Sequence, residues 1–357
     1  MKMNEPGIKI AAQVLPNPSE EDIAFIKEMG LEYVVLFAGG KYPGNANYDY
    51  FMKHREIFEP HGIKIYGFSN SNIHNHDSLV LNLSDRDEVI EEYKKYIRDL
   101  GKAGIPYSTY AHMGNGIWST SKEPTRGGAL GRAFNLDAET FYLNDRKGPR
   151  TILKGELTHS REYSEEELWE NFEYYIKAVK PTIEESGVKV GIHPDDPPGL
   201  KLGGIPRCIF STFSGYQRAL EIADSPNIGI CLCAGTWLEG GDTTEKNVTE
   251  MAKYFGDQNK LFKIHFRNVD KPLPHFKETF LDGGYMDMYK IIKVLKEVDF
   301  DGIIIPDHNP TMGSLEDRVS TDPHWHHKED KYGVANRTPT AFAIGYMKAL
   351  VERAEEE

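Results

Sequence analysis

Four short apolar runs in this sequence each end in a side chain that can bind a metal ion. Their sequences are Lys189-Val-Gly-Ile-His193, Gly229-Ile-Cys-Leu-Cys233, Phe262-Lys-Ile-His265 and Gly302-Ile-Ile-Ile-Pro-Asp307. Short apolar, β-branched runs of this kind are typical of buried parallel strands, and α/β folds place their chemistry where such strands end. We therefore predict that His193, Cys233, His265 and Asp307 form one metal site.

The ligand types narrow the choice of metal. Imidazole, thiolate and carboxylate together suit a divalent transition metal, and zinc, iron and manganese all fit, whereas the thiolate disfavours magnesium. Each residue also has an ordinary structural explanation: a histidine at a strand end can simply be hydrogen-bonded in a loop, and Asp307 can cap the following turn. Four ligand-type residues at equivalent places in consecutive units favour the metal site.

The three cysteines fit a reducing compartment. Cys208, Cys231 and Cys233 are odd in number and lack the spacing of a disulfide framework, so a thiolate ligand is the better use for one of them. Cys231 and Cys233 are two residues apart and point to the same side of a strand. Cys233 is nearer the rim and is the predicted ligand; the other two are predicted to be small buried thiols.

The elements that position these residues alternate regularly along the chain. Eight predicted strands, each followed by a predicted helix, lie at 8–14, 32–38, 64–68, 107–113, 189–193, 227–236, 261–269 and 302–306. No glycine fingerprint of a dinucleotide-binding fold follows the first strand. The pattern predicts an α/β fold, a (β/α)8 TIM barrel formed by a single domain over residues 1–357.

Two long connections stand out from this pattern. Residues 114–161, after strand four, show no clear periodicity and are rich in Gly, Arg and Asn, so we predict an insertion that acts as a lid or binding loop. A second extended loop follows strand eight and leads to a closing helix predicted at 338–353.

Composition excludes several classes of protein. The 357 residues include 42 basic and 55 acidic side chains, a net charge of −13, so nucleic acid would be repelled. The first residues lack the apolar core of a signal peptide, and no apolar run is long enough to cross a membrane. We expect a cytosolic enzyme without membrane or nucleic-acid partners.

Several motifs, in this order and spacing, resemble the mannonate dehydratase family of xylose-isomerase-like barrels. They are His193-Pro-Asp-Asp-Pro-Pro198, Cys233-Ala-Gly-Thr236, Ile264-His-Phe-Arg267, Tyr285-Met-Asp-Met-Tyr289 and Ile305-Pro-Asp-His308, and weaker similarity covers nearly the whole chain. The resemblance implies conversion of D-mannonate to 2-keto-3-deoxygluconate, usually with Mn2+. It also implies His193, Cys233, His265 and Asp307 as ligands, His308 as an acid/base residue, and Tyr332 in Tyr332-Gly-Val334 as the second one.

The chain departs from the family pattern at three places where substrate is expected. His74-Asn75 replaces a His-Glu pair, the strand-four loop around 111–128 is unusual, and the stretch 336–341 is longer than the corresponding family segment. The sugar acid can therefore differ from mannonate.

Candidate substrate contacts are cationic or imidazole side chains near the predicted rim. Arg267 lies two residues after His265, on the same face, where it could bind a substrate carboxylate bidentately or equally form a salt bridge at the rim. Arg126 and Arg207 lie in Gly-rich rim loops, and His74 could contact hydroxyl groups.

The leading hypothesis is a metal-dependent sugar-acid dehydratase that acts on a small substrate. One alternative is a sugar isomerase or epimerase, because the same enediolate can be reprotonated instead of losing hydroxide. Another is a sugar-binding protein that has lost catalysis. Barrels of this kind often form dimers or tetramers, so we expect a homo-oligomer.

Overall fold

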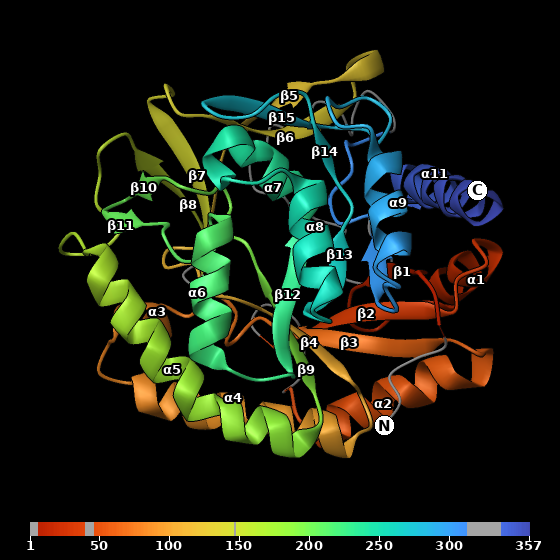
Figure 1. Ribbon diagram of the computed structural model, residues 1–357, viewed down its shortest axis with the longest axis horizontal. Helices are drawn as coiled ribbons and strands as arrows, with labels where there is room; N and C mark the ends of the chain where they lie inside the picture. Colours follow the sequence, from red (N-terminus) through yellow and green to blue (C-terminus); the bar gives the residue numbers. More distant parts are fainter. Residues whose placement is uncertain (1–5, 40–45, 146–147, 313–336) are drawn as a thin grey trace.

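Eight parallel strands close into a barrel in the computed structural model, which describes residues 6–39, 46–145, 148–312 and 337–357 (Figure 1). Around the barrel the strand order is β1-β16-β13-β12-β9-β4-β3-β2. The strands are β1 (Lys9–Val14), β2 (Tyr33–Ala38), β3 (Lys64–Asn70), β4 (Tyr107–Ala111), β9 (Lys189–His193), β12 (Ile228–Cys233), β13 (Leu261–His265) and β16 (Ile303–Ile305). The predicted (β/α)8 barrel is confirmed.

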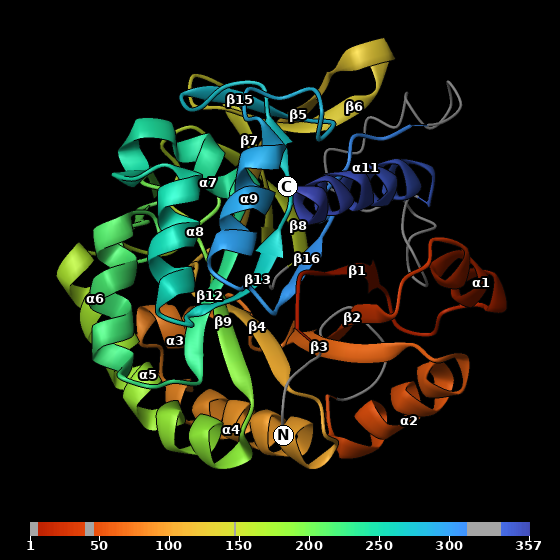
Figure 2. The same ribbon diagram turned by 45° about the vertical axis from the view of Figure 1, so that its right-hand side comes forward.

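Helices cover the outside of the barrel, as the connections between parallel strands require (Figure 2). They are α1 (Glu20–Glu28), α2 (Tyr48–Phe58), α3 (Asp77–Leu81), α4 (Arg86–Lys102), α5 (Glu165–Ser186), α6 (Phe213–Ala223), α7 (Ala234–Gly240), α8 (Val248–Asp257), α9 (Met288–Glu297) and α11 (Arg337–Glu356). Ser19 begins α1 and Ser164 begins α5, each in a capping box whose hydroxyl accepts from the third helical N–H. No helix in the described part of the chain is long and apolar enough to cross a membrane.

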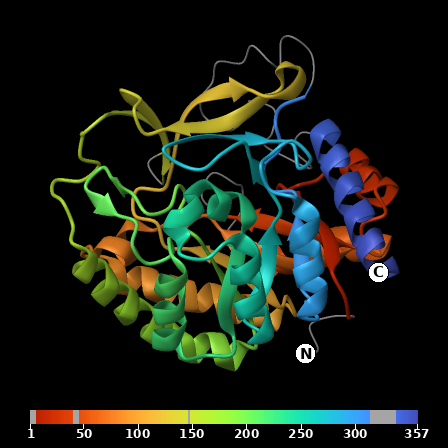
Figure 3. The same cartoon turned by 45° about the horizontal axis from the view of Figure 1, so that its top comes forward.

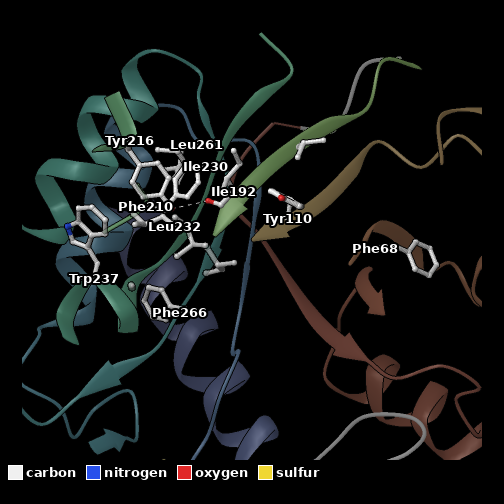
Figure 4. Close-up of a cluster of buried hydrophobic side chains, with 14 of the residues drawn as sticks. Phe68, Tyr110, Ile192, Phe210, Tyr216, Ile230, Leu232, Trp237, Leu261 and Phe266 are labelled. Atoms are coloured by element: carbon white, nitrogen blue, oxygen red, sulfur yellow. Dashed lines mark hydrogen bonds between the residues drawn. The ribbon is translucent and has the colours of Figure 1, made fainter. Parts of the chain in front are cut away.

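Strand side chains that point outward pack against these helices. Ile192 of β9 and Ile230 and Leu232 of β12 lie beside Tyr216 of α6 and Trp237 of α7 in the main apolar core (Figure 4). Tyr216 also donates from its hydroxyl to the carbonyl of Ile192 at 3.1 Å. Full burial of each such aliphatic side chain contributes about 1.5–3 kcal/mol to the stability of the folded protein. This core therefore holds the strand ends of the site in a fixed arrangement.

A separate apolar cluster occupies the barrel interior, where the inward side chains of alternating strand positions meet. Its members are all buried: Ala11, Tyr33, Val35, Tyr66, Tyr107, Phe262, Ile303 and Ile305. Inward-pointing side chains fill small barrels of this kind, so the interior of the barrel is packed with side chains. The four candidate ligands gather at its carboxyl-terminal mouth.

A six-stranded sheet lies over that mouth, with the order β14-β15-β6-β5-β7-β8 (Figure 3). Its strands are β5 (Ile117–Pro124), β6 (Leu130–Asn135), β7 (Thr140–Asp145), β8 (Gly148–Leu153), β14 (Asn268–Val269) and β15 (His275–Thr279). We call this sheet the cap sheet. A further two-stranded hairpin, β10 (Lys201–Leu202) and β11 (Ile205–Pro206), lies outside it.

The observed strands correct the expectations for residues 114–161 and for predicted strands six and seven. Residues 114–161 are largely strands rather than an irregular loop, because they pair with one another and β6 pairs with the distant β15. Predicted strand seven, 261–269, is interrupted: β13 ends at His265 and the chain then leaves the barrel to form β14. Strand six is also shorter than predicted, because Cys233 becomes the N-cap of α7.

Candidate metal centre

The four predicted ligands converge at the mouth of the barrel. Each of His193, Cys233, His265 and Asp307 offers one ligand atom, and these atoms all lie within 4.8 Å of one another. The parallel register explains the meeting, since Cys233 is paired with His265 across β12 and β13. Asp307 follows β16 by two residues. Four consecutive barrel strands thus place nitrogen, sulfur and oxygen around one point.

The two imidazoles are suited to a metal. Nδ1 of His193 lies 2.7 Å from the carbonyl oxygen of Pro194, which fixes the ring and leaves Nε2 free to act as a ligand. Both ring nitrogens of buried His265 lack a well-formed hydrogen bond to any residue that the structure describes, although Asp307 Oδ2 lies 3.2 Å from Nδ1. Buried polar atoms rarely remain unsatisfied, and a divalent ion would satisfy them.

The anionic ligands are kept ionised by their surroundings. Burial opposes ionisation of the Cys233 thiol, but Arg267 and the neighbouring His193 and His265 outweigh it and hold the pKa of Cys233 well below its usual value. Burial likewise opposes ionisation of Asp307, and the neighbouring His265 and His308 hold its pKa well below the usual range. Thiolate and carboxylate are the protonation states that bind metal.

Arg267 supports the thiolate directly. Its Nε and Nη2 donate to the sulfur of Cys233 at 3.2 and 2.9 Å. Gly235 makes this approach possible, because a Cβ at that position would lie 2.7 Å from the Cβ and 2.9 Å from the Nε of Arg267. The glycine in the Cys233-Ala-Gly-Thr236 motif therefore provides the space for the guanidinium.

Arg267 and Arg132 share three buried carboxylates, Asp196, Glu239 and Glu278. Glu239 lies 3.1 Å from Arg132 and 3.2 Å from Arg267, and both arginines also contact Asp196 and Glu278. All five side chains are at most 3% exposed. Burial, together with the charge of Asp196, raises the pKa of Glu239 well above its usual value, whereas both arginines overcome the burial of Asp196 and lower its pKa. We call these five residues the charge network.

The charge network joins the cap sheet to the metal centre. Arg132 belongs to β6 and Glu278 to β15, whereas Arg267 follows β13 of the barrel. Glu278 Oε1 also lies 2.9 Å from Nδ1 of His308, whose Nε2 is 3.3 Å from Asp307 Oδ2. The predicted acid/base imidazole therefore stands between a ligand and the network.

His74 lies close enough to His193 and His265 for their charges to affect its pKa. Burial is the main reason that the pKa of His74 falls to about 3, and the nearby His193 and His265 lower it further. Its Nδ1 is buried and has no hydrogen-bond partner within the described ranges. His74 is therefore a neutral imidazole at neutral pH.

The three arginines predicted to contact substrate are all engaged with protein groups. Arg267 donates hydrogen bonds to Cys233, to Thr236 and to carboxylates of the charge network. These contacts favour a salt-bridge role for Arg267 over a contact with the substrate carboxylate. Arg207 is buried and donates to the carbonyl of Asp196 at 2.6 Å and to that of Gly116. Arg126 is 56% exposed and pairs bidentately with Asp282 at 2.7 and 3.0 Å. Tyr332 lies outside the described residues.

Reasoning from the sequence missed most of the charge network. Asp196 had a local signal, because it lies in the acidic and proline-rich string that follows His193. Arg132, Glu239 and Glu278 had none, because nothing near them in the sequence marks them as buried. Arg132 and Glu278 come together through the pairing of β6 with β15, and Glu239 reaches them from α7.

Comparison with known proteins agrees with the geometry. A family model described as D-mannonate dehydratase matches residues 20–352. The mannonate dehydratase of Streptococcus equi subsp. zooepidemicus is 36% identical over 248 residues, which are 65% of this chain and 67% of that protein. The mannonate dehydratase of Oceanobacillus iheyensis is 34% identical over 298 residues, 78% of either chain.

Solved structures give the same result. The crystal structure of mannonate dehydratase from Streptococcus suis superposes with a TM-score of 0.77 at 26% identity and covers 99% of this chain and 95% of that chain. An L-ribulose 3-epimerase, at 12% identity and a TM-score of 0.57 with 98% of this chain and 96% of that chain covered, shares the fold alone. By both sequence and structure, the chain belongs to the D-mannonate dehydratase family of hydro-lyases.

Proposed function

We propose that this protein removes water from D-mannonate to give 2-keto-3-deoxygluconate and that it does so with a divalent metal ion at the candidate centre. The observation that supports this most is the convergence of His193, Cys233, His265 and Asp307 beside His308 in a chain of this family. We propose Mn2+ as the metal; Fe2+ and Zn2+ suit the same donors.

The reaction needs a base and a means of stabilising negative charge. The hydrogen at C2 of the sugar acid is very weakly acidic, and a metal ion bound to the four ligands would stabilise the charge that develops on the carboxylate. His308 takes the C2 proton, hydroxide leaves C3 with a proton as water, and the resulting enol becomes the ketone by protonation at C3. Substrate and product then differ by one molecule of water.

Other residues complete the proposed site. We retain Tyr332 as the proposed second acid/base group. The neutral imidazole of His74 is suited to a hydroxyl of the substrate, because it can donate or accept a hydrogen bond without carrying charge. We assign Arg267 to the support of Cys233 rather than to the substrate carboxylate.

A panel of hexonates tests this proposal. Protein loaded with Mn2+ is incubated with D-mannonate and its stereoisomers, and α-keto acids are measured by colorimetry and mass spectrometry. We expect a product 18 Da lighter from D-mannonate, the mass of one water, and no turnover by His308→Asn, which should keep its metal. A product of unchanged mass would instead support an isomerase or epimerase, and binding without turnover would support a sugar-binding protein.

The setting of the reaction is also a proposal. We propose that the protein acts in hexuronate breakdown in the cytosol, as a homo-oligomer. All three cysteines are free thiols, which fits a reducing compartment. Size-exclusion chromatography with light scattering tests the oligomeric state, and a mass equal to one chain would contradict it.

A further inference from the structure

We propose that Glu278 is a positioning residue for His308: from the cap sheet it holds the imidazole by Nδ1, so that Nε2 faces the metal centre as the atom that exchanges the proton. This inference rests on the proposed function, in which His308 is the acid/base group. It adds a residue of the cap sheet to a mechanism otherwise built from the barrel.

The contacts of His308 assign a separate role to each ring nitrogen. Nδ1 lies 2.9 Å from Glu278 Oε1, within hydrogen-bond distance. Nε2 lies 3.3 Å from Oδ2 of Asp307, one of the four candidate ligands. One side of the ring therefore faces the charge network, and the other faces the candidate metal centre.

The position of Glu278 is fixed on several sides. Its backbone is paired with Val269 of β14, and β6 approaches so closely that a Cβ on Gly131 would collide with the Glu278 carbonyl oxygen. Its carboxylate contacts Arg132 and Arg267, and the side chain is 3% exposed. A carboxylate held in this way can hold an imidazole with little freedom to rotate.

The charge of Glu278 selects one form of the imidazole. The guanidinium groups of Arg267 and Arg132 both contact its carboxylate, and these two positive charges favour the anionic form of Glu278 as the acceptor. A neutral imidazole next to it is stabilised with its proton on Nδ1, and Nε2 then keeps the lone pair that a base requires. An acidic side chain orients a catalytic histidine in the same way in the Ser-His-Asp triad.

Glu239 provides a control for the loss of contacts with the two arginines. It is buried and contacts the same Nη1 atoms of Arg132 and Arg267 as Glu278 does. The contacts found for its carboxyl group do not include His308. Glu278→Gln and Glu239→Gln therefore alter contacts with the same two arginines, Arg132 and Arg267. Glu278→Gln also alters the acceptor that faces the His308 imidazole.

The first readout is steady-state kinetics on D-mannonate with metal content measured for each protein. A neutral amide is a weaker acceptor than a carboxylate, so kcat of Glu278→Gln should fall about 10- to 100-fold while KM and bound metal change little. The fall in kcat should be smaller for Glu239→Gln than for Glu278→Gln. Equal kcat values for the two variants would overturn the inference.

The second readout observes the imidazole itself. Protein labelled with 15N-histidine and loaded with Zn2+, which is diamagnetic, reports the protonated nitrogen of each ring by NMR, and the His308 signals are those lost in His308→Asn. We expect His308 protonated at Nδ1 in the unchanged protein and in Glu239→Gln, and a shift toward Nε2 protonation in Glu278→Gln. A His308 already protonated at Nε2 in the unchanged protein would overturn the inference.

These readouts separate two kinds of failure. If the unchanged protein does not dehydrate D-mannonate, the proposed function fails, and the NMR measurement still decides the role of Glu278. If Glu278→Gln does not fold, Glu278→Asp retains the charge but withdraws the carboxylate by one methylene. Glu278→Asp should then show the lower kcat with unchanged metal content, and full kcat in this variant would contradict the inference.

Discussion

Arg267 and Cys233 are joined by two hydrogen bonds, from Nε and Nη2 of the guanidinium to the sulfur, at 3.2 and 2.9 Å. Both side chains are buried, so the positive charge stabilises the thiolate in a medium that screens it weakly. The sulfur is thereby oriented for metal binding by a residue that is not itself a ligand. This relationship makes the arginine part of the metal site.

Arg267→Lys should weaken metal binding. Lysine keeps the charge but cannot direct two N–H groups at the sulfur, so we expect metal affinity to fall about 10- to 100-fold, as for other partners that orient a ligand. Isothermal titration with Mn2+ or Zn2+ measures it. Arg55→Lys on the outer helix α2 is the control, since Arg55 pairs with Glu59 at the surface. An unchanged affinity for Arg267→Lys would separate the arginine from the metal site.

The two cysteines of β12 should behave differently. Cys233→Ala removes a ligand and should leave protein that loses its metal on dialysis, whereas Cys231→Ala should retain it. Cys231 is a stringent control because its thiol also ionises readily. Nearby His265 and Lys263 overcome the effect of burial and lower the pKa of Cys231 to about 7. Metal content is measured by mass spectrometry of the dialysed proteins. Loss of metal from Cys231→Ala with full retention by Cys233→Ala would reverse the assignment.

Arg132→Met should destabilise the protein strongly. Removal of one cation leaves Asp196, Glu239 and Glu278 buried with Arg267 alone, and breaking a buried ion pair typically costs about 3–5 kcal/mol. The free energy of unfolding in urea measures the loss. Lys253→Met is the control: Lys253 pairs with Asp257 on the surface of α8, and its removal should cost less than about 1 kcal/mol. If both variants lost the same free energy of unfolding, the charge network would not be a stabilising link between the cap sheet and the barrel.

His112 should make stability fall on acidification. Burial lowers the pKa of His112 from 6.5 to about 3. Between these values the unfolded chain binds a proton that the folded chain does not, so stability is lost as pH decreases below 6.5. His112→Phe removes this proton, and between about pH 4 and 5.5 its free energy of unfolding should depend less steeply on pH by about 1.4 kcal/mol per unit.

Urea titrations across this range measure the slope for both proteins. Phenylalanine fills a similar volume against the ring of Tyr175 but loses the 2.6 Å hydrogen bond between Tyr110 and His112. That loss lowers stability at every pH and does not alter the slope. Identical slopes would show that the imidazole is protonated in the folded protein.

The sequence was sufficient to predict the barrel and to choose the residues that converge at its mouth. His193, Cys233, His265 and Asp307 each follow a short buried run, and the parallel arrangement of strands brings equivalent positions together without knowledge of any side-chain contact. The prediction was possible because the signal for each ligand is local.

The cap sheet and the charge network could not be predicted in this way. Arg132 and Glu278 are 146 positions apart, and their meeting depends on the pairing of β6 with β15, for which neither strand carries a local signal. The spacing of Arg267 from His265 left a substrate contact and a salt bridge at the rim equally open, and it assumed a continuous strand. The strand ends at His265, and the chain then turns toward the charge network.

The most direct test of the account is the turnover of D-mannonate by protein stripped of metal and titrated with Mn2+. We predict that 2-keto-3-deoxygluconate is absent without metal and that its rate of formation rises in proportion to bound Mn2+ up to about one ion per chain, with no recovery in Cys233→Ala. Full activity in stripped protein, or Mn2+ bound without formation of the keto acid, would contradict the account.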